Sequence, residues 1–127
     1  MNLPPSPTAD VLIEVLHERG HQTAKHGEQN HLPDGTGPDL DLAVAFVAGR
    51  ITAEHLAEWA KARTKAASQN EGGDGSITFE HILTEEWAEA LAESDPAKLR
   101  AELIQVAAVA VQWVEAIDHR TVAESAS

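Results

Sequence analysis

The stretch Glu85-Glu86-Trp87-Ala88-Glu89, followed after twelve residues by Glu102-Leu103-Ile104-Gln105, places acidic side chains where a packed helix should be apolar. The surrounding pattern predicts a helix from Thr78 to Ser94, in which successive residues are rotated by about 100°. Glu86 then falls inside the apolar stripe of this helix, and Glu89 falls at the edge of that stripe. Acidic residues on a packing face are uncommon without a partner, so this stretch predicts a functional site as well as a helix.

The second acidic stretch falls on a predicted helix from Pro96 to Asp118, with Asp95 as its N-cap. Glu102 shares a face of this helix with apolar residues, and Gln105 lies one position round from it. An ionised carboxylate removed from water costs several kcal/mol unless it is paired or coordinates a cation. Carboxylate oxygens suit Mg²⁺ or Mn²⁺, and Mg²⁺ keeps positions free for water and substrate phosphates. The two stretches therefore predict a divalent metal centre that handles phosphates.

An alternative interpretation places the acids on the solvated face of an acidic protein. The acids at the helix edges would then pair with cations such as Lys98 or Arg100, as we expect for Glu85 and Glu93. Glu86 and Glu102 fit this interpretation less well, because their predicted positions face inward.

The composition predicts one soluble, cytoplasmic domain. The 127 residues contain no cysteine, which excludes disulfides and cysteine-based zinc sites, and we find neither a signal peptide nor a run of membrane-spanning length. Acidic residues outnumber basic ones 21 to 9, and no Lys/Arg cluster offers the footprint that a nucleic-acid polymer requires, so we expect neither nucleic acid nor a membrane as a partner. A small anionic ligand is still compatible, because a bound metal ion would invert the local potential.

The remaining apolar patterns predict further helices. One runs from Ala9 to about His26, capped by Thr8 or Asp10, and another is capped by Thr52 and runs to about Gln69. The apolar segment Asp39 to Ala48 has no clean period. We therefore predict an all-α fold, a bundle of four to five helices. Its domain spans residues 9–120, with flexible tails at 1–8 and 121–127.

The predicted last helix is apolar on nearly all sides. Between Leu103 and Val114 only Gln105 and Gln112 are strongly polar. A helix that is apolar all round needs neighbours all round, and one small bundle offers too few of them. We therefore expect a homodimer or homotetramer.

A different metal chemistry is suggested by His17-Glu18-Arg19-Gly20-His21, which matches the H-E-x-x-H pattern of zinc hydrolases. In that pattern two histidines one turn apart bind zinc, and the glutamate is the general base. Gly20 weakens the helix that the motif needs, and a third ligand would have to come from His26, Glu28 or His31, none of which has an identifying spacing. The alternative is that these are surface histidines.

The segment from Lys25 to Pro38 is dense in glycine, proline and polar side chains. This composition predicts a long ordered loop or lid, and such loops often carry binding residues. A solvent-exposed connection is the alternative.

The two acidic stretches resemble a known family, the all-α nucleoside triphosphate pyrophosphohydrolases of the MazG-like type. The family pattern is E-E-x-x-E followed, after a dozen or more residues, by E-x-x-D. Glu85-Glu86-x-x-Glu89 fits the first half, and Glu102-x-x-Gln105 fits the second half except at its last position. Glu18-Arg19 and the polar residues that follow, as far as Gly37, also look like the N-terminal segment of phage and actinobacterial MazG-like proteins.

The resemblance implies hydrolysis of a nucleoside triphosphate, with a deoxynucleotide expected, to the monophosphate and pyrophosphate. It implies Mg²⁺, with Mn²⁺ as a substitute, held by Glu86, Glu89 and Glu102 together with Gln105, which stands where the family has aspartate. Glu85 or Glu89 is the candidate for orienting the attacking water. The candidate substrate-binding residues are Gln22, Lys25, Gln29, His31, Asp34, Lys98 and Arg100. A helical module without catalytic activity, whose last helix serves assembly, is the alternative from a different class.

Overall fold

The computed structural model describes residues 6–39, 51–69 and 77–126, and all regular structure in this part of the chain is helical. The helices are α1 (Pro7–His26), α2 (Ala53–Ser68), α3 (Phe79–Ala92) and α4 (Pro96–Ala126). The predicted all-α class is confirmed, and the described residues contain four of the four to five helices that we expected. None of the described helices has the length and apolarity needed to cross a bilayer. Most of the apolar segment 39–48, the start of the predicted N-terminal tail and the last residue of the predicted C-terminal tail lie outside the described residues.

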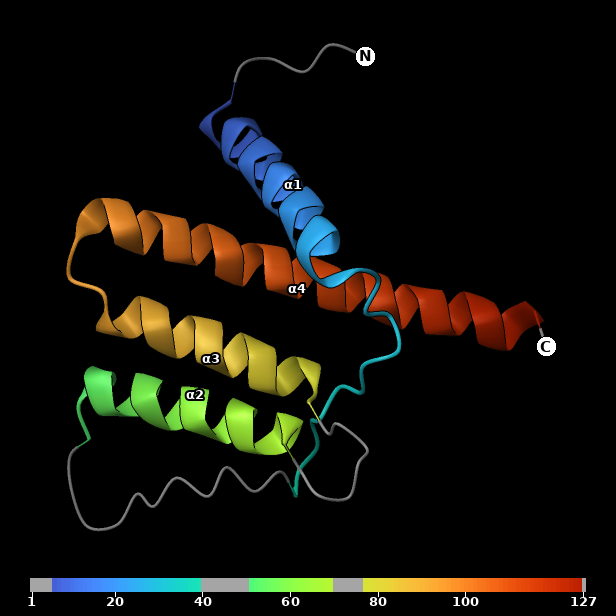
Figure 1. Cartoon of the computed structure of the whole chain (residues 1–127). Helices are drawn as coiled ribbons and strands as arrows, with labels where there is room; N and C mark the ends of the chain where they lie inside the picture. Colours follow the sequence, from blue (N-terminus) through green and yellow to red (C-terminus); the bar gives the residue numbers. More distant parts are fainter. Residues whose placement is uncertain (1–5, 40–50, 70–76, 127) are drawn as a thin grey trace.

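The long helix α4 is the element on which the rest of the fold is assembled. Figure 1 shows α2 and α3 side by side, with α3 packed on α4 and α1 crossing α4 on its other side. The last turns of α4 extend past the other helices (Figure 1). This arrangement places the acidic residues of α3 against the first half of α4.

The helix starts follow local capping chemistry. Thr52 and Asp95 cap α2 and α4 as predicted, since their side chains accept hydrogen bonds from backbone N–H groups at 3.2 and 2.9 Å. The prediction for α1 was wrong: Ser6 is its cap, because Pro7 fits the first helical position and starts the helix earlier than expected.

The predicted end of the last helix was also too early. The helix continues to Ala126 instead of ending at Asp118. The apolar periodicity fades after Asp118, but residues 119–126 contain neither glycine nor proline, so no residue there breaks the helix.

The centre of the core lies where α3 begins. Phe79 is fully buried, and its ring stacks on Trp113 of α4 with 5.7 Å between the ring centroids. Ala88, Ala108 and Ala116 are also fully buried, and such small side chains let the helices approach closely.

The loop after α1 is ordered and ties the end of α1 to the other helices. Its backbone carbonyls at Pro33 and Asp34 accept hydrogen bonds from the first two N–H groups of α3, both at 3.0 Å. The carboxylate of Asp34 accepts from the indole N–H of Trp113 at 2.6 Å and from Arg120 at 2.8 Å. Gly35 has φ 77°, and a Cβ atom there would lie 2.3 Å from the hydroxyl oxygen of Thr78, so the contact requires glycine. The predicted ordered loop is therefore present, and it holds α3 and α4 together.

Candidate metal centre

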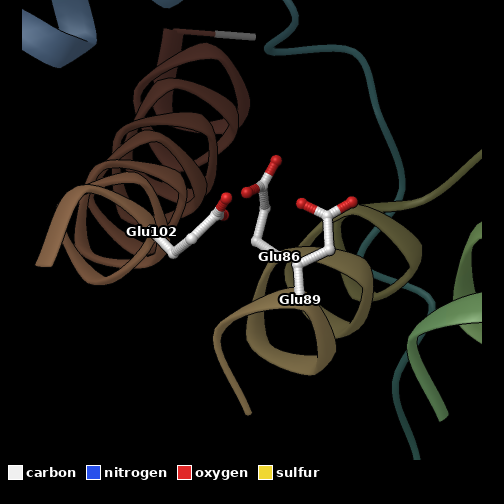
Figure 2. A group of neighbouring side chains, drawn as sticks. All are labelled: Glu86, Glu89 and Glu102. Atoms are coloured by element: carbon white, nitrogen blue, oxygen red, sulfur yellow. The ribbon is translucent and has the colours of Figure 1, made fainter. Parts of the chain in front are cut away.

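Three carboxylates from two helices converge beside the core. Glu86 and Glu89 lie three residues apart on α3 and therefore on one face, while Glu102 approaches from α4 (Figure 2). Each offers an oxygen, and these oxygens all lie within 4.8 Å of one another. Among the residues that the structure describes, no other group of three histidine or acidic side chains meets this condition. We call Glu86, Glu89 and Glu102 the carboxylate cluster.

Two oxygens of the carboxylate cluster are buried without a hydrogen-bond partner. They are one carboxylate oxygen of Glu86 and one of Glu102. Buried polar atoms in proteins are nearly always paired, and a buried ionised oxygen without a partner costs several kcal/mol. A cation placed between the two helices would satisfy both oxygens at once.

The electrostatics of the carboxylate cluster also favour a cation between the two helices. Burial raises the pKa of Glu86 to about 7, and the neighbouring charges of Glu89, Glu102, Glu85 and Glu18 add to this effect. Burial also raises the pKa of Glu89, together with Glu102 and Glu85, although Lys61 opposes them. Glu86 and Glu89 therefore hold protons more tightly than an ordinary glutamate, which is the behaviour of a site that lacks its positive charge.

A cavity of about 350 Å³ adjoins the carboxylate cluster. Its size is within the range of small-molecule sites. Glu86 lies in its wall, and the wall includes residues from all four helices. Its polar lining includes Glu18, Gln22, Lys25, Gln29, Gln105 and Gln112, and its apolar lining consists of Ile77, Ile82 and Val109. A ligand in this cavity would reach the carboxylates at one side and a wall of amides and aliphatic groups at the others.

Several predicted site residues are brought together here. Gln22, Lys25 and Gln29 line the same cavity as Glu86 and Gln105. Glu85 is half-buried beside the cluster, close enough to raise the pKa of both Glu86 and Glu89.

Other predicted substrate contacts are not brought to this cavity. His31 and Lys98 are exposed, and they line neither this cavity nor the neighbouring one beside Arg100. Asp34 also lies outside them, because its carboxylate is bound to Trp113 and Arg120. Arg100 lines a neighbouring cavity of about 330 Å³, where it pairs with Glu14 of α1 at 2.9 and 2.5 Å. The suggested pairing of Arg100 with acids at the edges of α3 is therefore wrong, because α1 supplies a closer carboxylate.

The H-E-x-x-H histidines do not form a three-ligand site within the described residues. His17 and His21 are exposed, and a ring nitrogen of His21 lies 3.8 Å from the carboxylate of Glu18. None of the suggested third ligands, which are His26, Glu28 and His31, joins them in a group of three.

Sequence reasoning missed the roles of two residues. Glu18, which we considered in the zinc motif and in the resemblance of the N-terminal segment but not as a site residue, lines the cavity from α1 and acts electrostatically on Glu86. Gln112 is only 6% exposed and lines the same cavity. The available signal was its position in an otherwise apolar stretch of α4, where a polar side chain needs a partner.

Comparisons with protein-family models, curated proteins and solved structures found no match for this chain. The interpretation of the site therefore depends on its own geometry and chemistry.

Proposed function

We propose that this chain is a Mg²⁺-dependent nucleoside triphosphate pyrophosphohydrolase, which converts a nucleoside or deoxynucleoside triphosphate and water to the monophosphate and pyrophosphate. The observation that carries the proposal is the carboxylate cluster, whose oxygens lie within 4.8 Å and include two buried atoms without a partner. The adjoining cavity is large enough for an organic ligand. An anionic ligand beside so many acids needs a metal ion between them, which explains why the two features occur together.

The residues present fit Mg²⁺ or Mn²⁺. The cluster offers hard oxygen donors from Glu86, Glu89 and Glu102, and Gln105 on the same stretch of α4 adds a neutral amide oxygen at the cavity. When bound, the ion would neutralise charge on the phosphate oxygens during hydrolysis.

The chain's own residues have separate tasks in the proposed reaction. A water oxygen forms a bond to the α-phosphorus while the bond to the bridging oxygen breaks and pyrophosphate leaves. Glu89 is our candidate for orienting this water and accepting its proton, because it belongs to the carboxylate cluster and is only partly buried. Glu85 is the alternative for this task. Lys25 lines the cavity, and we propose that its ammonium group contacts phosphate oxygens.

The direct test is incubation of the protein with a panel of ribonucleoside and deoxyribonucleoside triphosphates and Mg²⁺. We expect equal amounts of monophosphate and pyrophosphate from at least one of them, and none in EDTA. Release of neither product from any nucleotide, with Mg²⁺ or Mn²⁺ present, would contradict the proposed function.

A second prediction concerns Gln105. A glutamine oxygen carries no charge, so Gln105→Asp should strengthen Mg²⁺ binding to the free protein by roughly 1–2 kcal/mol, about tenfold or somewhat more. Glu102→Gln should do the reverse, because it removes a ligand charge one turn away. Calorimetric titration of both variants and the parent, with and without a non-hydrolysable nucleotide, makes the comparison. Unchanged or weaker binding by Gln105→Asp would show that Gln105 is not a ligand.

We also propose that a second copy of the chain covers the apolar side of α4. Leu103 and Val114 are 51% and 57% exposed there, and Ile117 is 41% exposed. With Ala107 and Ala110 they follow the alternating spacing of four and three residues that is typical of paired helices.

Light scattering tests this assembly. We expect a dimer or larger species for the parent, and a shift toward a mass of 13.6 kDa for Val114→Glu combined with Ile117→Glu. A parent mass of 13.6 kDa at micromolar concentration would rule the assembly out. An oligomer that hydrolyses no nucleotide would favour the non-catalytic assembly module instead.

A further inference from the structure

Gln112 is a buried polar residue that the proposed hydrolytic step does not use. It is 6% exposed, and it lines the cavity together with Gln29 from the loop after α1. Its side-chain N–H group donates a hydrogen bond to the amide oxygen of Gln29 at 3.0 Å. Gln112 follows Gln105 by seven residues, which places it on the same side of α4 and about 10 Å further along the helix. The amide pair therefore lies in the part of the cavity away from the carboxylate cluster.

The amide pair has hydrogen-bonding capacity left over. Each primary amide carries one oxygen acceptor and two N–H donors. The bond between the two residues leaves the oxygen of Gln112 and the nitrogen of Gln29, and neither makes another hydrogen bond to the described residues. The pair therefore presents the oxygen of Gln112 as an acceptor next to the two N–H groups of Gln29 as donors, besides the second N–H of Gln112. If both amides rotate, the donor and the acceptor exchange places while the bond between them is kept.

The rest of the cavity wall suits a flat, partly apolar group. Ile77, Ile82 and Val109 supply aliphatic surface in the same cavity. A ring with adjacent donor and acceptor groups on one edge would match both the aliphatic surface and the amide pair. The hydrogen-bonding edge of a nucleobase has this chemistry, and glutamine amides commonly pair with such edges.

We propose that Gln29 and Gln112 together read the hydrogen-bonding edge of the substrate's nucleobase. This inference rests on the proposed function, because it assigns the base to the cavity and the phosphates to the carboxylate cluster. Since the pair can rotate, it accepts cytosine, which presents an amino group beside a ring nitrogen acceptor, and uracil, which presents a carbonyl beside an N–H donor. We therefore expect the amide pair to discriminate little between these two bases.

The test uses uncharged nucleosides in EDTA, so that neither metal nor phosphate contributes to binding. NMR titration of the parent should give affinities for cytidine and uridine within about tenfold of each other, because a fixed amide would discriminate by that much or more. Gln112→Leu removes the amide but keeps an aliphatic side chain in the wall, and it should weaken binding of both nucleosides by about ten- to a hundredfold. Gln69→Leu makes the same change at an exposed position outside the cavity and should leave both affinities unchanged.

A second ligand and a second variant separate recognition from folding. Inorganic tripolyphosphate with Mg²⁺ has no base, so its binding should be the same for Gln112→Leu and the parent. Gln29→Leu, on the loop, should lower nucleoside affinity as Gln112→Leu does. Unchanged nucleoside binding by these variants, or an equal loss for tripolyphosphate, would overturn the inference.

The inference and the proposed function can fail separately. Nucleoside binding that depends on Gln112, in a protein that releases no pyrophosphate, would refute the hydrolase and keep the base site. Pyrophosphate release by a Gln112→Leu protein whose nucleoside affinity is unchanged would support the hydrolase and contradict the base site.

Discussion

Replacement of Glu86 by glutamine is expected to abolish pyrophosphate release and weaken Mg²⁺ binding. The change keeps the shape of the side chain but removes a charge of the carboxylate cluster that has a buried oxygen without a partner. Loss of an outer partner of a metal ligand typically costs about 10–100-fold, so loss of a ligand charge should cost at least about a hundredfold in turnover. Initial rates with saturating Mg²⁺ and calorimetric metal titrations measure the two effects.

The matched control is Glu58→Gln, which removes an exposed charge from α2 at a position outside the cluster and the cavities. It should leave turnover and metal affinity unchanged. If Glu86→Gln binds Mg²⁺ and turns over nucleotide like the control, the acidic centre has been assigned to the wrong residues.

The carboxylate cluster could be predicted from sequence because its geometry is mostly local. Glu86 and Glu89 share a face through the helical repeat alone, and Glu102 stands out as an acid on an apolar face. Bringing α3 against α4 needed only a short connection between two apolar helices, since α4 begins at Pro96 soon after α3 ends.

The rest of the site depends on long-range packing that helical periodicity does not encode. Glu18 reaches the cavity only because α1 crosses α4, and nothing in the spacing of α1 specifies that crossing. Asp34 was expected at the substrate, but the fold of its loop directs it to Trp113 and Arg120 instead. In the same way, Arg100 finds Glu14, a partner 86 residues away in the sequence. A motif identifies the type of residue, whereas the tertiary fold decides which partner it meets.

Glu80, another acid on α3, has a lowered pKa, whereas the pKa of Glu86 is raised. Glu80 is 7% exposed and accepts hydrogen bonds from both terminal nitrogens of Arg63 and from Thr84. Burial alone would raise the pKa of Glu80, but the bonds from Arg63 and Thr84 outweigh it and hold this pKa below its ordinary value of 4.5. One helix therefore carries a carboxylate stabilised as an anion and, six residues later, one destabilised as an anion.

The two acids should respond to the same substitution with opposite signs. In EDTA at pH 8, Glu80→Gln should lower the free energy of unfolding by about 3 kcal/mol, because it leaves the largely buried Arg63 without its charge partner. Glu86→Gln should raise the free energy of unfolding by about 1–2 kcal/mol. This is less than the full effect of a pKa shift from 4.5 to about 7, because partial exposure screens Glu86. Urea unfolding of both variants and the parent gives the two differences.

The pH dependence of each difference follows from the direction of the pKa shift. The raised pKa of Glu86 means that the folded parent binds the extra proton between pH 4.5 and about 7. Its stability therefore falls as pH rises through that window, and the gain from Glu86→Gln should grow there and level off above pH 7. The lowered pKa of Glu80 stabilises the fold above pH 4.5, and that contribution is lost as pH falls below this value. The loss of unfolding free energy caused by Glu80→Gln should therefore become smaller only as the pH falls below 4.5.

A double replacement tests whether the Glu80 effect comes from the ion pair. Exchanging both Arg63 and Glu80 for apolar residues, as Arg63→Met with Glu80→Leu, should recover most of the loss caused by Glu80→Gln, because no buried charge is left alone. Loss of stability by Glu86→Gln at pH 8, comparable to that of Glu80→Gln, would show that Glu86 is paired in the folded protein. The carboxylate cluster would then be a structural hydrogen-bond network and not a cation-binding site.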